Sequence, residues 1–306
     1  MQVFSSTVNQ MLVLVAFVSL GFVLNKIKFL PKETANVISK LESFVLGPAL
    51  AFSNFCKNFT VQNISQKWHY VLYSSVIVII SFVIALVLAK FFEKDKYLKN
   101  LYAYSFTASN FGFMGQAVVL GVFGEEGLFG YLIFCIPLYV FVYSFGIAML
   151  IPTKTQKESM LKKFVNPNFI LMLCGALIGL LKIPTPKFIT DVASSLGACM
   201  APLAMILTGV IVAEHSVKKL AMVKKIYLAS IIRLVFIPLF FYGILTLLKT
   251  DSEVIKFTLC ATAMPLGLNT IVFPAAYNED TTVGASMALI SHVMSVITIP
   301  LMFLLI

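Results

Sequence analysis

The sequence predicts an all-α integral membrane protein, with ten transmembrane helices arranged as two inverted repeats of five and with the fourth and ninth helices broken. Three observations predict this fold class. The composition is far more apolar than that of a soluble domain. Ten apolar runs have the length needed to cross a bilayer. Two stretches that lie 155 residues apart carry the same kind of interruption.

The composition indicates the solvent. Of the 306 residues, 59% are hydrophobic and 12% are charged, whereas soluble domains have about 25% charged residues. A water-soluble core of this size cannot hide so much apolar surface, so we expect a bilayer to cover it. The net charge of +10 is spread over several short loops, without a basic arm or a nucleic-acid module. Attraction to the anionic inner leaflet explains it, and we expect no nucleic-acid partner.

The apolar runs define the predicted spans. A helix needs about 20 apolar residues to cross about 30 Å of hydrocarbon, and short polar links separate ten such runs, of which the sixth is short. The runs cover roughly 6–25, 34–56, 69–91, 98–123, 127–151, 167–182, 188–213, 225–248, 254–277 and 282–306. The predicted domains are a first five-helix repeat at 1–151, a short cytoplasmic link at 152–166 and a second, inverted repeat at 167–306.

The distribution of lysines predicts the orientation. No basic residue precedes the first run, and Lys26 and Lys28 follow it, which is the reverse of a secretory signal peptide. With the N-terminus outside, sixteen lysines fall on the inner side and six on the outer side. Basic residues gather in cytoplasmic loops. We therefore expect a multi-pass protein of the plasma membrane with both termini outside the cell.

Two registers indicate an internal duplication. Gly21 to Pro48 matches Gly175 to Pro202 at a shift of 154, each with a basic, proline-containing link between the glycine and the proline. Further along, 108–115 matches 263–270 at a shift of 155. Because each half has five spans, an odd number, the second half enters the membrane from the opposite side. This is the inverted repeat of many secondary carriers.

The two matched stretches at 108–115 and 263–270 break apolar spans with asparagine, glycine and proline. An unpaired backbone group costs several kcal/mol in hydrocarbon, so a broken helix persists at membrane depth only where it lines a cavity or site. The second half of a cut helix begins with free N–H groups and a positive dipole end, which favour an anion such as a carboxylate. We expect the binding site there, with a core of Ser109, Asn110, Gly112, Pro265, Gly267 and Asn269, and with Thr107, Gln116 and Thr270 as further candidates.

The two asparagines have alternative roles. Asn110 and Asn269 each offer donor and acceptor groups, so each can hold a carboxylate or satisfy the exposed backbone of its own break. Both roles can coexist. An Asn110→Ala protein that folds, inserts and transports normally would refute the direct role.

The first broken stretch, Ala108 to Gly115, followed by Phe123 to Leu128, resembles the fourth span of the auxin efflux carrier family, which includes plant carriers and bacterial organic-acid permeases. Ala263, Met264 and Pro265, then Asn269 and Tyr277, are similar to the ninth span of the bacterial branch. The resemblance covers the whole chain, and the short link after span five also matches the bacterial members. One departure is Ala117, where family members often have a proline.

The resemblance implies an arrangement like that of the NhaA antiporter and the bile-acid symporters. Spans 1, 2, 6 and 7 would form a scaffold, and spans 3–5 and 8–10 a transport bundle. The two broken helices would cross near the midplane, and the scaffold would form a homodimer. The function it implies is secondary transport of a small organic anion, auxin-like or a dicarboxylate.

Three ionisable residues fall inside spans, where charge is rare and suggests function. Arg233 lies eight residues beyond Lys225, about 12 Å into the helix, and Glu42 lies at a similar depth in the second span. They can form an intramembrane ion pair, or Arg233 can extend to the inner surface. His292, in the last span, and Tyr139 and Tyr143, in the fifth, can line the cavity or relay a proton, with packing as the alternative role for each.

Other classes of protein are less well supported. The chain has no His-Glu-x-x-His or Gly-x-Ser-x-Gly motif, so we expect neither an enzyme nor a metal site, and no cofactor. An anion channel, or a membrane sensor or structural protein, remains the alternative function. Neither break contains Asp or Glu, which favours proton coupling or uniport over sodium. The cysteines have no metal-site spacing and are interpreted as small apolar residues: Cys56, Cys135, Cys174, Cys199 and Cys260.

Overall fold

The computed structural model describes residues 2–150 and 166–306, and within them the named elements are all helices joined by short links. These residues form no named strand; their one β feature is an isolated antiparallel bridge between Ser109 and Leu266. The predicted cytoplasmic link at 152–166 lies outside the described residues except for Asn166, which caps the next helix by accepting from the Phe169 N–H at 3.0 Å.

The first half contains three long helices and several shorter, connected ones. Its elements are α1 (Gln2–Lys26), α2 (Thr34–Leu41), η1 (Glu42–Leu46), α3 (Gly47–Asn58), α4 (Val61–Phe92), α5 (Lys96–Thr107), η2 (Phe111–Gly115), α6 (Gln116–Phe134), α7 (Ile136–Phe141), η3 (Val142–Gly146) and α8 (Ile147–Leu150). Within α6 the chain turns at Gly124, whose φ of +69° is a conformation that favours glycine. The predicted boundary between the fourth and fifth spans falls at this turn.

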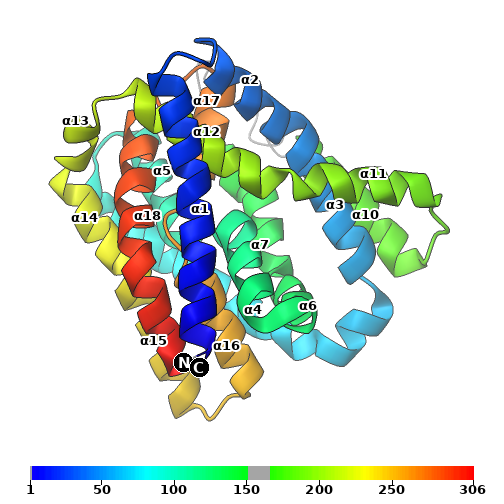
Figure 1. Ribbon diagram of the computed structural model, residues 1–306. Coiled ribbons are helices and arrows are strands. Elements are labelled where there is room, and N and C mark those ends of the chain that lie inside the picture. The colour runs from blue at the N-terminus through cyan, green and yellow to red at the C-terminus, as the bar shows by residue number, and fades with distance from the viewer. Residues whose placement is uncertain (1, 151–165) are drawn as a thin grey trace.

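The second half repeats the pattern of long and connected helices. Its elements are α10 (Pro167–Leu181), α11 (Lys187–Ala198), α12 (Met200–Glu214), α13 (Val217–Ala221), α14 (Lys224–Ile231), η4 (Ile232–Phe236), α15 (Ile237–Leu247), α16 (Ser252–Thr262), α17 (Asn269–Ala276), α18 (Thr282–Met302) and η5 (Phe303–Leu305). The start of α1 and the end of α18 lie at the same end of the molecule (Figure 1).

The helices identify a multi-pass membrane protein. Six helical segments are long and apolar enough to span a bilayer: Phe4–Lys26, Val61–Phe92, Phe111–Phe134, Lys187–Glu214, Lys224–Leu247 and Thr282–Leu305. Two shorter apolar helices cover Ile136–Leu150 and Pro167–Leu181. Large apolar side chains point outward, among them Phe91, 80% exposed, and Leu247, 84% exposed, as a lipid-facing surface requires. The ten-span count and the inverted repeat stay predictions.

Two pairs of helices pack at very short range. Helix α1 lies against α12, and α3 against α10. A Cβ atom on Gly21 or on Gly209 would lie 2.0 Å from a carbonyl oxygen of the opposite helix, and one on Gly175 would lie 2.5 Å from the Phe52 oxygen. Small residues let membrane helices approach closely, because van der Waals packing drives their association. Helices α5 and α16 lead into the breaks, and α4 packs against α5 while α15 packs against α16. Helix α14 packs against α18.

The described residues contain four π turns, η1 to η4, and two of them, η1 and η4, interrupt membrane helices at a charged residue. In η1 the Gly47 N–H donates to the Glu42 oxygen, and Pro48 follows; in η4 the Ile237 N–H donates to the Ile232 oxygen, and Pro238 follows. A proline has no N–H to continue the normal ladder, and a π turn absorbs the mismatch. Glu42 and Arg233 lie inside these two turns. Such turns are frequent at functional sites.

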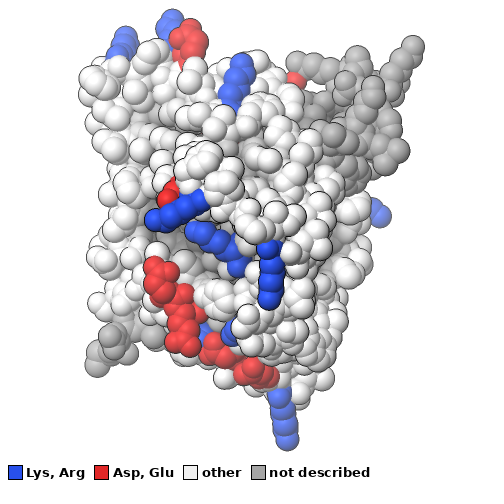
Figure 2. Space-filling model, turned by 90° about the vertical axis from the view of Figure 1, so that its right-hand side faces the viewer, with Lys and Arg blue, Asp and Glu red and all other residues white. Residues whose placement is uncertain are grey.

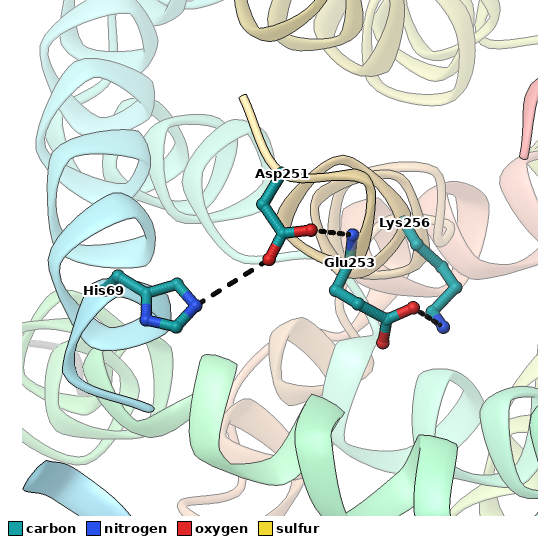
Figure 3. Close-up of polar contacts among 4 residues, drawn as sticks. All are labelled: His69, Asp251, Glu253 and Lys256. Carbon is teal, nitrogen blue, oxygen red and sulfur yellow. Dashed lines mark hydrogen bonds and ion pairs between the residues drawn. The ribbon is translucent and has the colours of Figure 1, made fainter. Parts of the chain in front are cut away.

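Charged side chains gather in the lower half of one face, with a few more at its upper edge (Figure 2). Near the start of α16, Lys256 bonds Glu253 at 2.5 Å, and His69 of α4 lies 3.8 Å from Asp251 (Figure 3). These ionic contacts involve partly exposed groups outside the apolar part of the helices.

Candidate functional site

The two broken segments meet. Helix α5 ends at Thr107 and η2 begins at Phe111, while α16 ends at Thr262 and α17 begins at Asn269. Between these ends the backbones run antiparallel: Ser109 pairs with Leu266, and the Asn110 N–H donates to the Pro265 oxygen at 2.8 Å. Two stretches separated by 155 residues therefore satisfy each other's backbone at a buried point, as broken helices in a membrane must.

Side chains bond further backbone groups in and next to the second break. The Leu266 N–H donates to the Ser291 hydroxyl of α18 at 3.2 Å, and the Ser109 hydroxyl donates to the Ala261 oxygen at 2.6 Å. Pro265 contributes no N–H and cannot continue α16. A Cβ on Gly267 would lie 2.9 Å from the Ala108 oxygen, so only glycine lets the two breaks come this close.

Asn110 holds the start of the second half-helix in the first break. Its side-chain oxygen accepts from the Met114 N–H at 3.4 Å, and its amide nitrogen lies 3.1 Å from His292 Nε2. Since the amide nitrogen can only donate, Nε2 accepts; His292 Nδ1 then carries the proton and donates to the Ala288 oxygen at 2.8 Å. The arrangement describes a neutral histidine that orients Asn110.

The further predicted residues have different surroundings. Asn269 donates to the Tyr104 hydroxyl at 2.7 Å, whereas Gln116 bonds the Tyr139 hydroxyl. Thr107 and Thr270 use their hydroxyls on nearby backbone oxygens, of Ala103 at 2.8 Å and of Gly267 at 2.9 Å. Both threonines are committed to the ends of their own helices.

Arg233 and Glu42, which depth alone left as a possible ion pair, are not paired in the described structure. The Arg233 guanidinium is buried and donates to the Phe106 oxygen at 3.0 Å and to the Ala261 oxygen at 3.4 Å. These carbonyls lie in the last turns of α5 and α16, the negative ends of two helix dipoles. The packing of α14 and η4 near both breaks, rather than depth alone, decides the partner: Arg233 joins the two helix ends as a fixed cation.

Glu42 lines the crossover and has no hydrogen-bond partner in the part of the chain that the structure describes. Its side chain is fully buried, and both carboxyl oxygens lack a hydrogen-bond partner among the described residues. Next to it, the Ser43 oxygen accepts from the Asn168 side chain of α10 at 3.0 Å. The π turn and Pro48 deprive that oxygen of a helical donor, so α10 supplies one.

A small cavity of about 30 Å³ lies at the crossover. Its lining includes Ser109, Asn110, Gly112, Gly267 and Asn269, five of the nine predicted binding residues; Pro265, Thr107, Gln116 and Thr270 are not in that lining. The volume holds about two water molecules. Elements from both halves of the chain thus close around one polar point.

The lining also includes Tyr139 and Tyr143, for which a place in the cavity was one of the expected roles. Glu42, singled out for another role, lines it as well, together with three residues that the sequence analysis did not single out: Tyr104, Asn168 and Met200. Of these three, Asn168 carries a signal in the sequence, because it is a polar residue in an apolar run. Tyr104 carries none, because aromatic residues are common throughout the chain.

A larger cavity of about 470 Å³ adjoins the crossover. The two share Leu50, Gly112 and Phe113, and the larger one continues past Gln116 to Lys57. Lys57 is exposed at the end of α3, where its ammonium donates to the Ser194 hydroxyl at 2.6 Å. We call this larger cavity the vestibule. His292 also lines a separate, largely apolar cavity of about 650 Å³ beside α1.

A helical, multi-pass membrane protein in which two broken helices meet at a buried polar point belongs to the class of membrane transport proteins. The chain is a member of the membrane transport protein family, the auxin efflux carrier family: the family model matches residues 6–303. The resemblance predicted from the two broken stretches is confirmed, and the family is one of transporters rather than enzymes.

Two curated relatives match nearly end to end. One is an uncharacterized transporter of Methanothermobacter thermautotrophicus, 23% identical over 308 residues, with 98% of each chain covered. The other is an uncharacterized transporter of Methanocaldococcus jannaschii, 25% identical over 303 residues, with 95% of this chain and 96% of the relative covered.

Proposed function

We propose that the protein is a secondary transporter that moves a small organic anion, a carboxylate, across the cell membrane by alternating access, and that the anion binds at the crossover. The observation that carries the proposal is that the N-terminal ends of two half-helices, η2 and α17, line the same cavity. Phe111, Gly112 and Phe113 begin η2, and Leu268 and Asn269 begin α17.

Helix starts favour an anion for two reasons. The first N–H groups of a helix have no preceding turn to bond, and the helix dipole places partial positive charge there. Two such ends facing one small space make a carboxylate site without a basic side chain. The Asn110 and Asn269 amides add donors and acceptors. At the opposite, negative ends Arg233 supplies the cation, so each pole of the crossover has a suitable charge.

The vestibule supports access from one side. Lys57 at its exposed end attracts anions, and Gln116, Gly112 and Phe113 lead inward to the crossover. The crossover cavity itself, at about 30 Å³, is too small for a carboxylate with a carbon chain. An occluded centre beside a wide vestibule is what alternating access requires. The lysine distribution puts Lys57 on the outer face, so we assign this conformation as outward-facing.

The helix packing supports a division of the spans into a scaffold and a transport bundle. The close pairs α1 with α12 and α3 with α10 belong to spans 1, 2, 6 and 7, which we propose as the scaffold and as the homodimer interface. The helices that lead into the breaks belong to the other group, which would move against this scaffold. In the proposed arrangement the five spans of the first half of the chain and the five of the second half form the inverted repeat. The binding site lies between the scaffold and the transport bundle.

Counterflow in liposomes tests the proposal. Purified protein is reconstituted with unlabelled malonate, malate or indole-3-acetate inside, and uptake of the same labelled compound is measured. A carrier gives saturable uptake that internal substrate stimulates. Asn110→Ala should reduce it at least tenfold, while Gly243→Ala, whose added Cβ meets nothing within 4 Å, should leave it unchanged. Ion conductance far above carrier turnover would support the alternative, an anion channel, and no uptake of any carboxylate would contradict the substrate class.

A further inference from the structure

Glu42 is a carboxyl group enclosed in the substrate cavity. It lies in η1, in the middle of the second apolar run, is 0% exposed, and lines the same cavity as Ser109, Asn110 and Asn269. Both of its carboxyl oxygens lack a hydrogen-bond partner among the described residues. The anion site of the proposed transporter therefore contains an acidic group of its own.

No basic group faces this carboxyl within the described chain. The other titratable side chains around the cavity are the phenols of Tyr104, Tyr139 and Tyr143, from α5, α7 and η3. The elements packed against η1 are α2, α3, α10, α11, α12 and α17. Their titratable residues are exposed, apart from the half-buried Cys56: Lys40, Lys57, Cys174, Lys187, Asp191 and Glu214.

An ionised carboxylate in such a place is very unfavourable. Burying an isolated charge costs far more than burying the neutral acid, so the group neutralises by binding a proton unless a cation pairs with it. Arg233, the buried cation of the crossover, is already bonded to the Phe106 and Ala261 oxygens at the ends of α5 and α16. In the described conformation Glu42 is consequently a protonated acid.

The crossover offers no comparable place for a coupling cation. In broken-helix carriers the C-terminal ends of half-helices and their free carbonyls coordinate the coupling ion. In this structure the guanidinium of Arg233 takes that position. His292, at the edge of the crossover, is held between Asn110 and the Ala288 oxygen. Among the described residues that line the cavity, Glu42 is the carboxyl group that can exchange a proton with the vestibule water when the site opens.

We infer that Glu42 is the proton-binding residue of the carrier, and that its protonation is required for the substrate anion to bind. This inference rests on the proposed function. A carboxylate on Glu42 would repel a second carboxylate in the same small cavity, whereas the neutral acid would not. Glu42 takes its proton from vestibule water, the anion enters, and both are released on the other side. One proton and one monocarboxylate together move no net charge.

The linkage between proton and anion is measured directly. Binding of indole-3-acetate, and separately of malonate, to the purified protein is followed by calorimetry between about pH 7 and 9, where both probes are ionised. Because the protonated form binds the anion, affinity rises as the pH falls, by up to about tenfold per pH unit. In Glu42→Gln, a permanently neutral isostere, this dependence should vanish and the affinity should equal that of the wild type at the lowest pH.

Transport gives a second readout. An inward proton gradient should drive accumulation of the probe by wild-type protein, and Glu42→Gln should abolish that accumulation while keeping counterflow. Glu42→Asp, which still titrates, should retain pH dependence. Glu33→Gln, an exposed glutamate before α2, is the matched control and should behave as wild type.

A third readout needs no substrate. The infrared carbonyl band of a protonated acid should be present in the wild type and absent in Glu42→Gln. If Glu42→Gln keeps proton-driven accumulation and pH-dependent binding, or if the band does not change, the inference is overturned. If the wild type shows no counterflow with any carboxylate but loses the band in Glu42→Gln, the proposed substrate class fails while the protonation of Glu42 stands.

Discussion

The two breaks begin alike and end differently. Helices α5 and α16 each start after an aspartate cap: Asp95 accepts from the Leu98 N–H at 2.9 Å, and Asp251 accepts from the Glu253 N–H at 3.1 Å. Each ends at a threonine, Thr107 or Thr262, whose hydroxyl donates to the oxygen four residues earlier. Beyond the threonines the first break is short, 108–110, and the second is longer, 263–268.

The difference lies in what holds each break. In the first, Asn110 caps η2 with its own side chain. In the second, the helix α17 has no side-chain cap, and support comes from other parts of the chain: Ser291, Ser109 and Arg233. The first break is thus specified locally, whereas the second, with Pro265, depends on its neighbours. Mutations should affect the two unequally.

The largest effect is expected at Arg233, which serves both breaks. In Arg233→Met the Phe106 and Ala261 oxygens lose a charged donor. With about 1.5 kcal/mol or more for each such bond, the protein should lose about 3 kcal/mol of stability. The melting temperature in detergent, followed by light scattering or by fluorescence-detected size-exclusion chromatography, checks this. Arg233→Lys keeps the charge but loses the second donor nitrogen, so its melting temperature should lie between those of the wild type and Arg233→Met. Equal melting temperatures of Arg233→Met and the wild type would contradict the idea that Arg233 stabilises both breaks.

A large effect is expected from Gly267→Ala in the second break. The new methyl group would meet the Ala108 oxygen at 2.9 Å and Tyr104 at 3.2 Å, and such overpacking costs about 1–3 kcal/mol. Transport should be lost and melting lowered. Gly112→Ala in the first break is the comparison, because its Cβ would lie 3.6 Å from Tyr139, an ordinary contact. Equal stability of the two variants would show that the breaks are not packed differently.

A moderate effect separates the two asparagines. Asn110→Ala removes a helix cap and should lower the free energy of unfolding by about 1 kcal/mol. Asn269→Ala removes only the bond to Tyr104 and should lower it by less. Asn110→Asp keeps the capping oxygen but loses the amide donor to His292, so it should lose less stability than Asn110→Ala and yet bind the anion at least tenfold more weakly. Thermal melting and binding, measured on the same preparations, distinguish capping from substrate contact. Normal binding by Asn110→Asp would leave Asn110 with the capping role alone.

The smallest effects are expected at the helix starts. Asp95→Ala and Asp251→Ala should each cost about 1 kcal/mol as lost caps. Asp251 also faces His69 at 3.8 Å (Figure 3), but both groups are partly exposed, and such pairs contribute about 0–1 kcal/mol. His69→Gln should therefore melt within a degree or two of the wild type, and added salt should not change the difference. A larger loss for His69→Gln than for Asp251→Ala would reverse this ranking.

Much of the crossover was predictable from the sequence because its causes are local. Pro265 lacks an N–H, and Asn110 and Gly112 disfavour a continuous helix, so the breaks could be located to within a residue or two. The family resemblance came from the same residues. The predicted runs fall on helices, including the turn at Gly124. Five predicted binding residues line one cavity, although their contact with a substrate stays a proposal.

The partners of the charged residues were not predictable. Arg233 and Glu42 have similar depths, which follow from the rise of 1.5 Å per residue, and depth suggested a pair. The direction in which each side chain points does not follow from its depth. Both lie in π turns, and each π turn adds a residue and rotates the following helix face relative to a regular helix. Sequence periodicity based on 3.6 residues per turn cannot give that rotation.

The sequence alone determined the solvent, the helices and the places where two of them break, because apolar content, proline and glycine act within a few residues of themselves. The tertiary structure decided which atoms meet at the breaks: Arg233 with the oxygens of Phe106 and Ala261, and Asn269 with Tyr104. It also placed Glu42 at the cavity, with no basic partner among residues 2–150 and 166–306. Those contacts join residues far apart in the chain, and they depend on helix packing that no local pattern encodes.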